Sequence, residues 1–301
     1  MQNTSTVKVA CLQMNSTNNV HENLGIIERA LSDADPIDLL VLPENFAQMP
    51  ARRAEQHIEL MEDGSDQSDV QSNNQYDGQH NHQTIVQRFL VDMAARHAVH
   101  IVAGSLPTRV ELQQKPFARC HIVGPSGPLG HYDKLHLFDV DVATQNGSQT
   151  YRESDSYQAG SNTSKNTSLH TLNIDQNTVR LGASICYDLR FPELYRQFAA
   201  SGAQMITVPA AFTYHTGEAH WETLLRARAI ENQAFVLAAA QTGEHANGRK
   251  TWGHSMVIDP WGDVIARLET ETGLLYADLD LDGIEALKGR FPVHNHRRIK
   301  A

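Results

Sequence analysis

Apolar stretches with the character of β-strands alternate with amphipathic helical stretches along almost the whole chain. Residues 7–14 (VKVACLQM) are apolar at both odd and even positions, as expected of a strand that is buried on two faces. Further apolar runs predict strands at 38–42, 100–104, 119–123, 129–134, 179–185, 204–208, 234–240, 256–258, 264–267 and 274–279. Because helices and strands interleave without a linker, we expect residues 1–301 to form a single α/β domain with sheets inside and helices outside.

Helices are predicted where apolar side chains recur at helical spacing. The first carries Leu24, Ile27 and Leu31 on one stripe. The others are expected at 84–98, with Ile85, Phe89 and Met93 toward the core; at 192–201, where Pro192 suits a first turn; and at 218–232, with Trp221, Leu224, Leu225 and Ala229 on one stripe.

Two polar segments interrupt this alternation. Residues 62–83 carry too little apolar surface to offset the entropy cost of ordering them, so we expect a mobile surface insertion there. Residues 144–150 are similarly polar, and they predict a shorter loop.

The composition excludes several classes of protein. Hydrophobic residues make up 41% of the chain and charged residues 20%, as in globular proteins. A net charge of −10 argues against nucleic-acid binding, which needs a basic surface. No apolar run approaches the ~20 residues of a membrane span, and the polar residues 1–7 do not resemble a signal peptide. We therefore expect a soluble cytoplasmic protein with no nucleic-acid or membrane partner.

Cys186 is the first residue that could carry chemistry. It ends the apolar run LGASIC and precedes a turn into the predicted helix at 192–201. A thiol in this position has exposed backbone N–H groups beside it, which lower its pKa and can also bind an oxyanion. An inert buried cysteine is the alternative, and it is the expected state of Cys11 and Cys120, which lie inside strand patterns.

Glu44 and Lys134 are the other two candidates. Glu44 directly follows the apolar run LLVLP, where partial desolvation would raise its pKa toward that of a useful general base. Lys134 ends an apolar hairpin strand, where its charge is costly to bury without a carboxylate or an oxyanion as partner. Taken singly, Glu44 could instead cap a helix or form an ion pair, and Lys134 could extend along the surface.

Metal and nucleotide cofactors have no support in the sequence. The histidine pairs at 80 and 82 and at 294 and 296 lie in the polar insertion and in the tail, without a companion cysteine or an HExxH motif. The chain has no Walker loop and no GxGxxG motif after a predicted strand.

Three long blocks around these candidates resemble the signature blocks of the nitrilase, or carbon–nitrogen hydrolase, superfamily. They are VLPENF, HYDKLHLFDVDV and GASICYDLRFPELYR, and they occur in the order that the family shows. The resemblance implies a four-layer αββα sandwich and a catalytic triad of Glu44, Lys134 and Cys186. It also implies that Glu153 is a second glutamate that steadies the lysine and the attacking water.

The resemblance further implies amide hydrolysis through a cysteinyl thioester, without a metal or an organic cofactor. Lys134 and the backbone N–H of Tyr187 would stabilise the oxyanion, and Phe212 and Thr213 would line the pocket. Arg190 is a candidate for binding a substrate carboxylate, with an ion pair to Asp188 or Glu193 as the alternative. Family members commonly form homodimers through the helices beside the nucleophile, which here include 192–201 and 218–232, so we expect a homodimer or a higher homo-oligomer.

A narrower similarity concerns the substrate. The segment PAAFTYHTGEAHWETLLRARAIENQAFVLAAAQTGEH, followed by WGHSMVIDPWG, is similar to the branch of deaminated-glutathione amidases. The neighbouring ω-amidase branch, which acts on α-ketoglutaramate, usually differs at 209–211 and 226–231. A nitrile hydrolase or an N-carbamoyl amidase would share the same triad. An inactive binding protein is the alternative that is not an enzyme.

Overall fold

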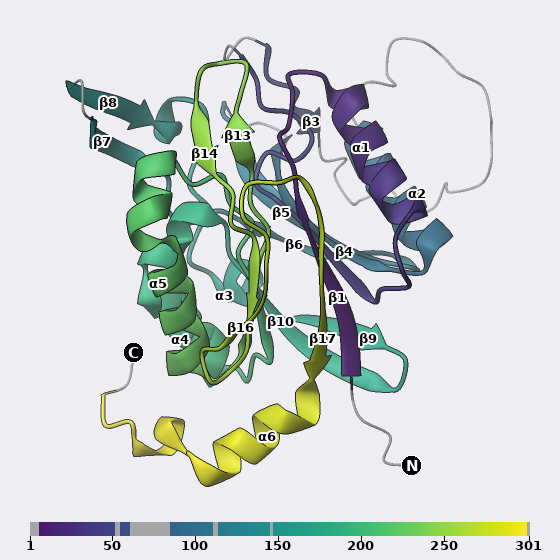
Figure 1. Ribbon diagram of the computed structural model, residues 1–301, viewed down its shortest axis with the longest axis vertical. Helices are drawn as coiled ribbons and strands as arrows, with labels where there is room; N and C mark the ends of the chain where they lie inside the picture. Colours follow the sequence, from purple (N-terminus) through teal and green to yellow (C-terminus); the bar gives the residue numbers. More distant parts are fainter. Residues whose placement is uncertain (1–5, 52–54, 61–84, 111–113, 145–146, 300–301) are drawn as a thin grey trace.

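Two large β-sheets lie face to face at the centre of the molecule (Figure 1). The structure is a computed structural model, and it describes residues 6–51, 55–60, 85–110, 114–144 and 147–299. One buried apolar cluster contains inward-facing side chains of both sheets, among them Val9 and Val41 from the first sheet and Leu181 and Ile206 from the second. The two sheets therefore share a core.

The first sheet has the order β17-β1-β2-β4-β5-β6, with β3 paired to β4. Its parallel centre consists of β1 (Thr6–Gln13), β2 (Leu39–Leu42) and β4 (His100–Arg109), and its antiparallel flanks are β17 (Gly273–Asp280), β5 (Phe117–Gly124) and β6 (Gly127–Asp133). The short strand β3 covers Glu59–Leu60. Since β4 to β6 form an antiparallel meander, β6 runs in the same direction as β2.

The second sheet repeats this plan, with the order β16-β15-β12-β11-β10-β9. Its parallel centre is β10 (Asn177–Ala183), β11 (Met205–Thr207) and β12 (Phe235–Ala238), and its antiparallel flanks are β9 (His170–Ile174), β15 (Met256–Ile258) and β16 (Val264–Arg267).

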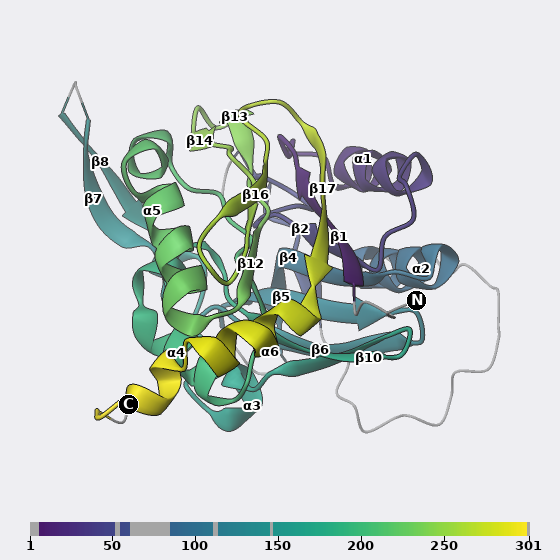
Figure 2. The same cartoon turned by 60° about the horizontal axis from the view of Figure 1, so that its bottom comes forward.

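Helices cover the outer faces of both sheets, as Figures 1 and 2 show. On the first sheet lie α1 (Val20–Ser32) and α2 (Ile85–His97), and on the second lie α4 (Pro192–Ala200) and α5 (Tyr214–Asn232). The short helix α3 (Ser164–Thr167) contacts β6 and α4, and α6 (Leu281–Arg290) follows β17. The predicted αββα sandwich is confirmed.

Two details of the prediction are wrong. In α2 the buried side chains are Val86, Leu90, Met93 and Ala94, whereas Ile85 and Phe89 are only partly buried at the edge of the core. The predicted loop at 144–150 is largely part of a hairpin, β7 (Asp139–Thr144) and β8 (Gly147–Arg152), which projects beside α5 in Figure 2. Its strands pair through the backbone, so they need no apolar alternation to form.

Two further expectations concern parts of the chain away from the core. The proposed insertion at 62–83 lies outside the described residues. Within the part of the chain that the structure describes, no helix is long and apolar enough to cross a membrane.

Candidate active site

The ends of three strands bring Glu44, Lys134 and Cys186 together. Glu44 follows β2, and Lys134 directly follows β6, so both lie at the same edge of the first sheet. Cys186 follows β10 at the corresponding edge of the second sheet. In parallel sheets this edge, beyond the carboxyl ends of the strands, is where ligands bind.

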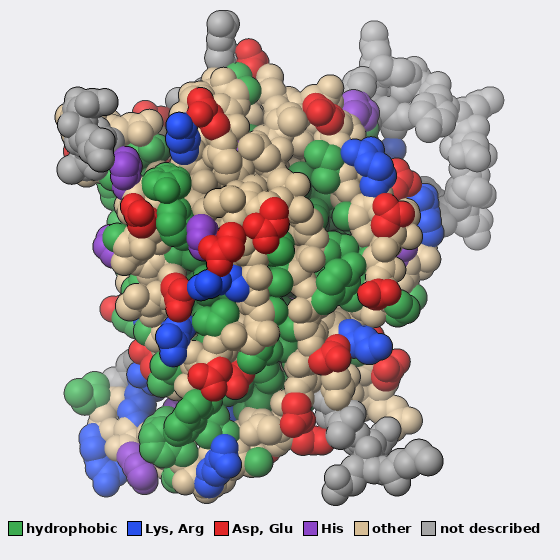
Figure 3. Space-filling model, viewed as in Figure 1, with side chains coloured by type: hydrophobic (Ala, Val, Ile, Leu, Met, Phe, Trp, Pro, Cys, Tyr) green, Lys and Arg blue, Asp and Glu red, His purple; other side chains and the backbone are tan. Residues whose placement is uncertain are grey.

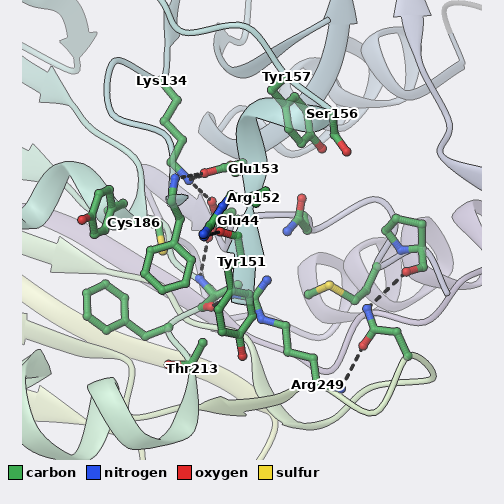
Figure 4. Close-up of a pocket in the computed structure, with 18 of the residues that line it drawn as sticks. Glu44, Lys134, Tyr151, Arg152, Glu153, Ser156, Tyr157, Cys186, Thr213 and Arg249 are labelled. Atoms are coloured by element: carbon green, nitrogen blue, oxygen red, sulfur yellow. Dashed lines mark hydrogen bonds and ion pairs between the residues drawn. The ribbon is translucent and has the colours of Figure 1, made fainter. Parts of the chain in front are cut away.

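Lys134 is buried between two carboxylates (Figure 4). Its side chain is 1% exposed, and its Nζ donates to Glu44 Oε1 at 2.7 Å and to the two Glu153 oxygens at 2.8 and 2.9 Å. Glu153 begins a short 3-10 helix (Glu153–Asp155) after β8, and its Oε2 also accepts from the Phe138 N–H at 2.6 Å. A buried ammonium is stable only when it is paired and hydrogen-bonded, and these two carboxylates meet that requirement.

Cys186 sits at a strained turn. It has a φ of 49°, in the left-handed region that non-glycine residues seldom adopt, and it begins the 3-10 helix η3 (Cys186–Arg190). Its own N–H donates to Pro209 O at 2.8 Å, and its thiol forms a hydrogen bond with Glu44. The second oxygen of Glu44 accepts from the Ala211 N–H at 2.9 Å. Glu44 therefore contacts both the lysine and the thiol.

Asp188 holds this turn in place from beneath. Its buried carboxylate accepts hydrogen bonds from the Ile185 N–H at 3.0 Å and the Tyr132 hydroxyl at 2.8 Å. His136 lies 2.7 Å from the other oxygen and stacks on Phe191, with ring centroids 3.7 Å apart. Asp188 thus links the turn at Cys186 to β6 and to the segment that follows it, and it forms no ion pair with Arg190.

The electrostatics of the site differ from the sequence prediction. Burial opposes ionisation of Glu44, but the charge of Lys134 and hydrogen bonds from Cys186 and Lys134 outweigh it and lower the pKa of Glu44. Burial and the negative charge of Glu44 raise the pKa of Cys186 well above its usual value. The predictions of a raised pKa for Glu44 and a lowered pKa for Cys186 are therefore wrong. The resting pair is a carboxylate and a neutral thiol.

The two partners of this pair are also shifted. Burial lowers the pKa of Lys134, but Glu153 and Glu44 outweigh burial and raise that pKa well above its usual value. Burial raises the pKa of Glu153, and the charge of Glu44 adds to this effect, although Lys134 opposes it. Lys134 therefore keeps its charge throughout the ordinary pH range.

A cavity of about 340 Å³ opens above Cys186. All of the residues predicted to act on or bind the substrate line it, namely Glu44, Lys134, Glu153, Cys186, Tyr187, Arg190, Phe212 and Thr213. The guanidinium carbon of Arg190 lies 5.4 Å from the centre of the Phe212 ring and 5.8 Å from that of Tyr187. Arg190 forms no ion pair with Asp188 or Glu193, so this alternative from the sequence is wrong.

Sequence reasoning missed several residues of this cavity. Tyr151 comes from the polar hairpin β7–β8, and Arg249 precedes β14 (Lys250–Trp252), which pairs with β13 (Thr242–Glu244). Gln56 and Tyr157 form a hydrogen bond to each other on another wall. These residues lie in a polar hairpin strand and in polar loops, whose sequence pattern does not indicate where they fold.

No group of three or more histidine, cysteine or acidic side chains within the described ranges is arranged to hold a metal ion. The acidic and sulfur atoms of the cavity are instead bonded to Lys134 and to one another.

Comparisons with known proteins agree with this geometry. The carbon-nitrogen hydrolase family model matches residues 8–289. The deaminated glutathione amidase of Yersinia enterocolitica is 39% identical over 296 residues, which cover 96% of this chain and 92% of that protein. The human omega-amidase NIT2 is 36% identical over 210 residues, which cover 69% of this chain and 71% of that protein. The NitFhit protein of Caenorhabditis elegans has a crystal structure with a TM-score of 0.81 and 32% identity; the match covers 98% of this chain and 66% of that one.

The fold and the site define a hydrolase of the αββα type with a cysteine, a lysine and a glutamate at its centre. The chain belongs to the carbon–nitrogen hydrolase family, and it is an amidohydrolase.

The site geometry predicts how the thiol of Cys186 titrates. Thiolate absorbance in the ultraviolet, measured against Cys186→Ala, should be absent from the wild-type protein up to at least pH ~8.5, the ordinary thiol pKa. Glu44→Gln removes a negative charge beside the sulfur, so it should lower the pKa of Cys186. Lys134→Met removes a positive charge, so it should raise that pKa further.

Cys11 and Cys120 do not obscure this titration, because burial raises the pKa of Cys11 to about 12 and also raises that of Cys120. A strong thiolate signal in the wild-type protein at neutral pH would contradict the account.

Proposed function

We propose that this protein hydrolyses the γ-linked amide of deaminated glutathione, with Cys186 as nucleophile and with no cofactor. The observation that carries the mechanism is the double contact of Glu44, which bonds both the Cys186 thiol and Lys134 Nζ. The similarity to the Yersinia enterocolitica deaminated glutathione amidase along almost the whole chain supports the substrate.

The first half of the reaction forms the thioester. Glu44 takes the thiol proton while the sulfur attacks the amide carbon, and the electron pair of the carbonyl moves onto its oxygen. Lys134 and the Tyr187 N–H stabilise this oxyanion. Tyr187 lies in the first turn of η3, where an N–H has no acceptor within its own helix. When the oxyanion collapses, the C–N bond breaks and Glu44 gives the proton to the leaving amine.

The second half releases the acid. Glu44 takes a proton from water, whose oxygen attacks the thioester carbon. The C–S bond then breaks, and the sulfur recovers its proton from Glu44. Glu153 keeps Lys134 fixed through both halves, because its two oxygens lie 2.8 and 2.9 Å from Nζ.

The substrate preference follows from charge. Deaminated glutathione carries a keto group where glutathione carries an ammonium, and a desolvated ammonium without a partner costs several kcal/mol. Arg190 has no ion pair among the described residues, and it lies over Phe212 and Tyr187 at the cavity wall. We assign it to the carboxylate beside the keto group of the substrate, where a positive side chain would also repel an ammonium.

An ω-amidase acting on α-ketoglutaramate is the second candidate, supported by the 36% identity to human omega-amidase NIT2. The two candidates share the acyl half of the substrate, so they differ only in the amine that leaves.

The test is a comparison of kcat/KM for deaminated glutathione, intact glutathione, α-ketoglutaramate, a simple nitrile and an N-carbamoyl amino acid. Deaminated glutathione should be preferred by about tenfold or more, which corresponds to about 1.4 kcal/mol. Cys186→Ala should turn over none of these compounds. If the wild-type protein also turned over none of them, the alternative of an inactive binding protein would be correct. A tenfold preference for α-ketoglutaramate would establish the second candidate, and a preference for the nitrile or the carbamoyl compound would overturn both.

We also propose a homodimer with two-fold symmetry through α4 and α5. Ile230, Trp261 and Phe291 are 47, 58 and 49% exposed, and the rings of Trp261 and Phe291 are in contact. In Figure 3 hydrophobic side chains gather at the bottom of the view, near α6 and the lower ends of α4 and α5.

Sedimentation at micromolar concentration should give about twice the 33.5 kDa mass of the chain. Ile230→Glu should weaken the dimer, whereas Leu129→Glu, at a similarly exposed site (44%) on β6 of the other sheet, should not. A wild-type protein that sediments only as a monomer would contradict this assembly.

Location and domain organisation are proposals of the same kind. Three cysteines that are all free suit the reducing cytoplasm, and recovery of the protein in a secreted fraction would contradict this location.

We propose that residues 1–301 form one domain, which predicts a single unfolding transition that different spectroscopic probes report alike.

A further inference from the structure

Arg249 lies in the same cavity as Cys186, yet the proposed mechanism gives it no role. Its Nη2 donates to the carbonyl oxygen of Ala211, and its guanidinium carbon lies 5.7 Å from the centre of the Tyr151 ring. Its Nε is buried and has no hydrogen-bond partner among the described residues. The contacts of the described residues therefore leave part of the hydrogen-bonding capacity of this guanidinium unused, although such capacity is usually satisfied in folded proteins.

The other cations of the cavity are neutralised more fully. Lys134 is paired with two carboxylates, and Arg152 is paired with Asp141 at 3.1 Å. Arg190 and Arg249 are the cavity cations without an ion pair within the described part of the chain. Glu44, Glu153 and Lys134 together carry one net negative charge when both carboxylates are ionised. This charge repels an anionic substrate, and the two arginines without an ion pair more than offset it.

The two arginines lie on different sides of the reacting centre. Ala211 donates its N–H to Glu44 Oε2 and accepts from Arg249 through its carbonyl oxygen, so Arg249 lies on the Glu44 side. Arg190 closes the turn that begins with Cys186. Figure 4 shows Cys186 on one side of Glu44 and the side chain of Arg249 on the other.

The position of Arg249 identifies the part of the substrate that it meets. In the proposed function, on which this inference rests, Glu44 protonates the leaving nitrogen, so the leaving amine must extend past Glu44. We propose that Arg249 binds a carboxylate on this leaving amine, and that the preferred substrates are amides of amino acids or short peptides. Guanidinium groups suit this task because they bind carboxylates through two parallel hydrogen bonds.

This assignment separates the two candidate activities by a single charge. Deaminated glutathione releases a dipeptide with a carboxylate, whereas α-ketoglutaramate releases ammonia, which leaves Arg249 without a partner. Arg249 would therefore be a specificity-determining residue that acts on the leaving group.

The experiment uses two substrates that share the same acyl group. This acyl group is that of the panel compound with the highest kcat/KM. One has glycine as its leaving amine and the other has glycinamide, which replaces the carboxylate with a neutral amide of similar shape. The wild-type protein should prefer the glycine compound by about tenfold or more in kcat/KM, as expected for hydrogen bonds to a charged group. In Arg249→Gln this ratio should fall toward one, and Arg249→Lys should retain part of it.

Lys250→Gln is the matched control, because Lys250 is the neighbouring cation on the same hairpin and pairs with Glu244 in solvent. It should keep the wild-type ratio. A wild-type ratio of one or less would overturn the proposal whether or not Arg249→Gln folds. An unchanged ratio in a folded Arg249→Gln, judged by its melting temperature, would also overturn it.

The outcome is distinct from that of the proposed function. If the panel selects an acyl group unrelated to α-keto acids but the glycine compound is still preferred through Arg249, the substrate assignment fails and the role of Arg249 stands. If deaminated glutathione is the preferred substrate but the glycine compound is not preferred over the glycinamide compound, the substrate assignment stands and the role of Arg249 fails.

Discussion

The buried charge of Lys134 is the constraint on which the site depends. An ammonium that is 1% exposed requires carboxylates within hydrogen-bond distance, and here they come from two separate segments. Glu44 follows a central strand of the first sheet, and Glu153 follows the hairpin β7–β8. Because both glutamates contact Lys134, the hairpin β7–β8 is held against the first sheet. Glu44 also contacts the thiol of Cys186, which follows a strand of the second sheet.

The same constraint determines which atom holds the proton before reaction. Because Lys134 stabilises negative charge on Glu44, the carboxylate is ionised and the thiol beside it is neutral. In the proposed mechanism, the thiolate therefore forms only as the proton moves to Glu44 during attack. That mechanism differs from one with a preformed thiolate, and it assigns each proton transfer in the cycle to one glutamate.

The sequence predicts the parts of the molecule that depend on burial. Apolar runs predicted most strands of the two large sheets. The residues at the ends of three of these runs were candidates, and the family resemblance singled out Glu44, Lys134 and Cys186 as a triad. Within the first sheet, Glu44 and Lys134 lie at one edge because β2 and β6 run in the same direction. Helix faces were predicted less well, since Phe89 and Leu90 are equally apolar and only packing decides that Leu90 is buried.

Features that depend on three-dimensional contacts could not be predicted in this way. The pKa directions at Glu44 and Cys186 follow from charges contributed by residues far apart in the chain. Arg249 lies in a polar turn, and only the fold shows that its guanidinium enters the cavity. Glu153 was placed by family resemblance, because a polar hairpin has no periodic signal to locate it.

The most direct test of the central claim is intact-protein mass spectrometry after rapid acid quenching of the enzyme with an amide substrate. The account predicts an increase equal to the mass of the acyl group, located on the peptide that contains Cys186 and absent from Cys186→Ala. An acyl group on Lys134 would contradict the account. So would turnover without any acyl adduct on the wild-type protein, with a substrate whose thioester is hydrolysed slowly enough to be trapped.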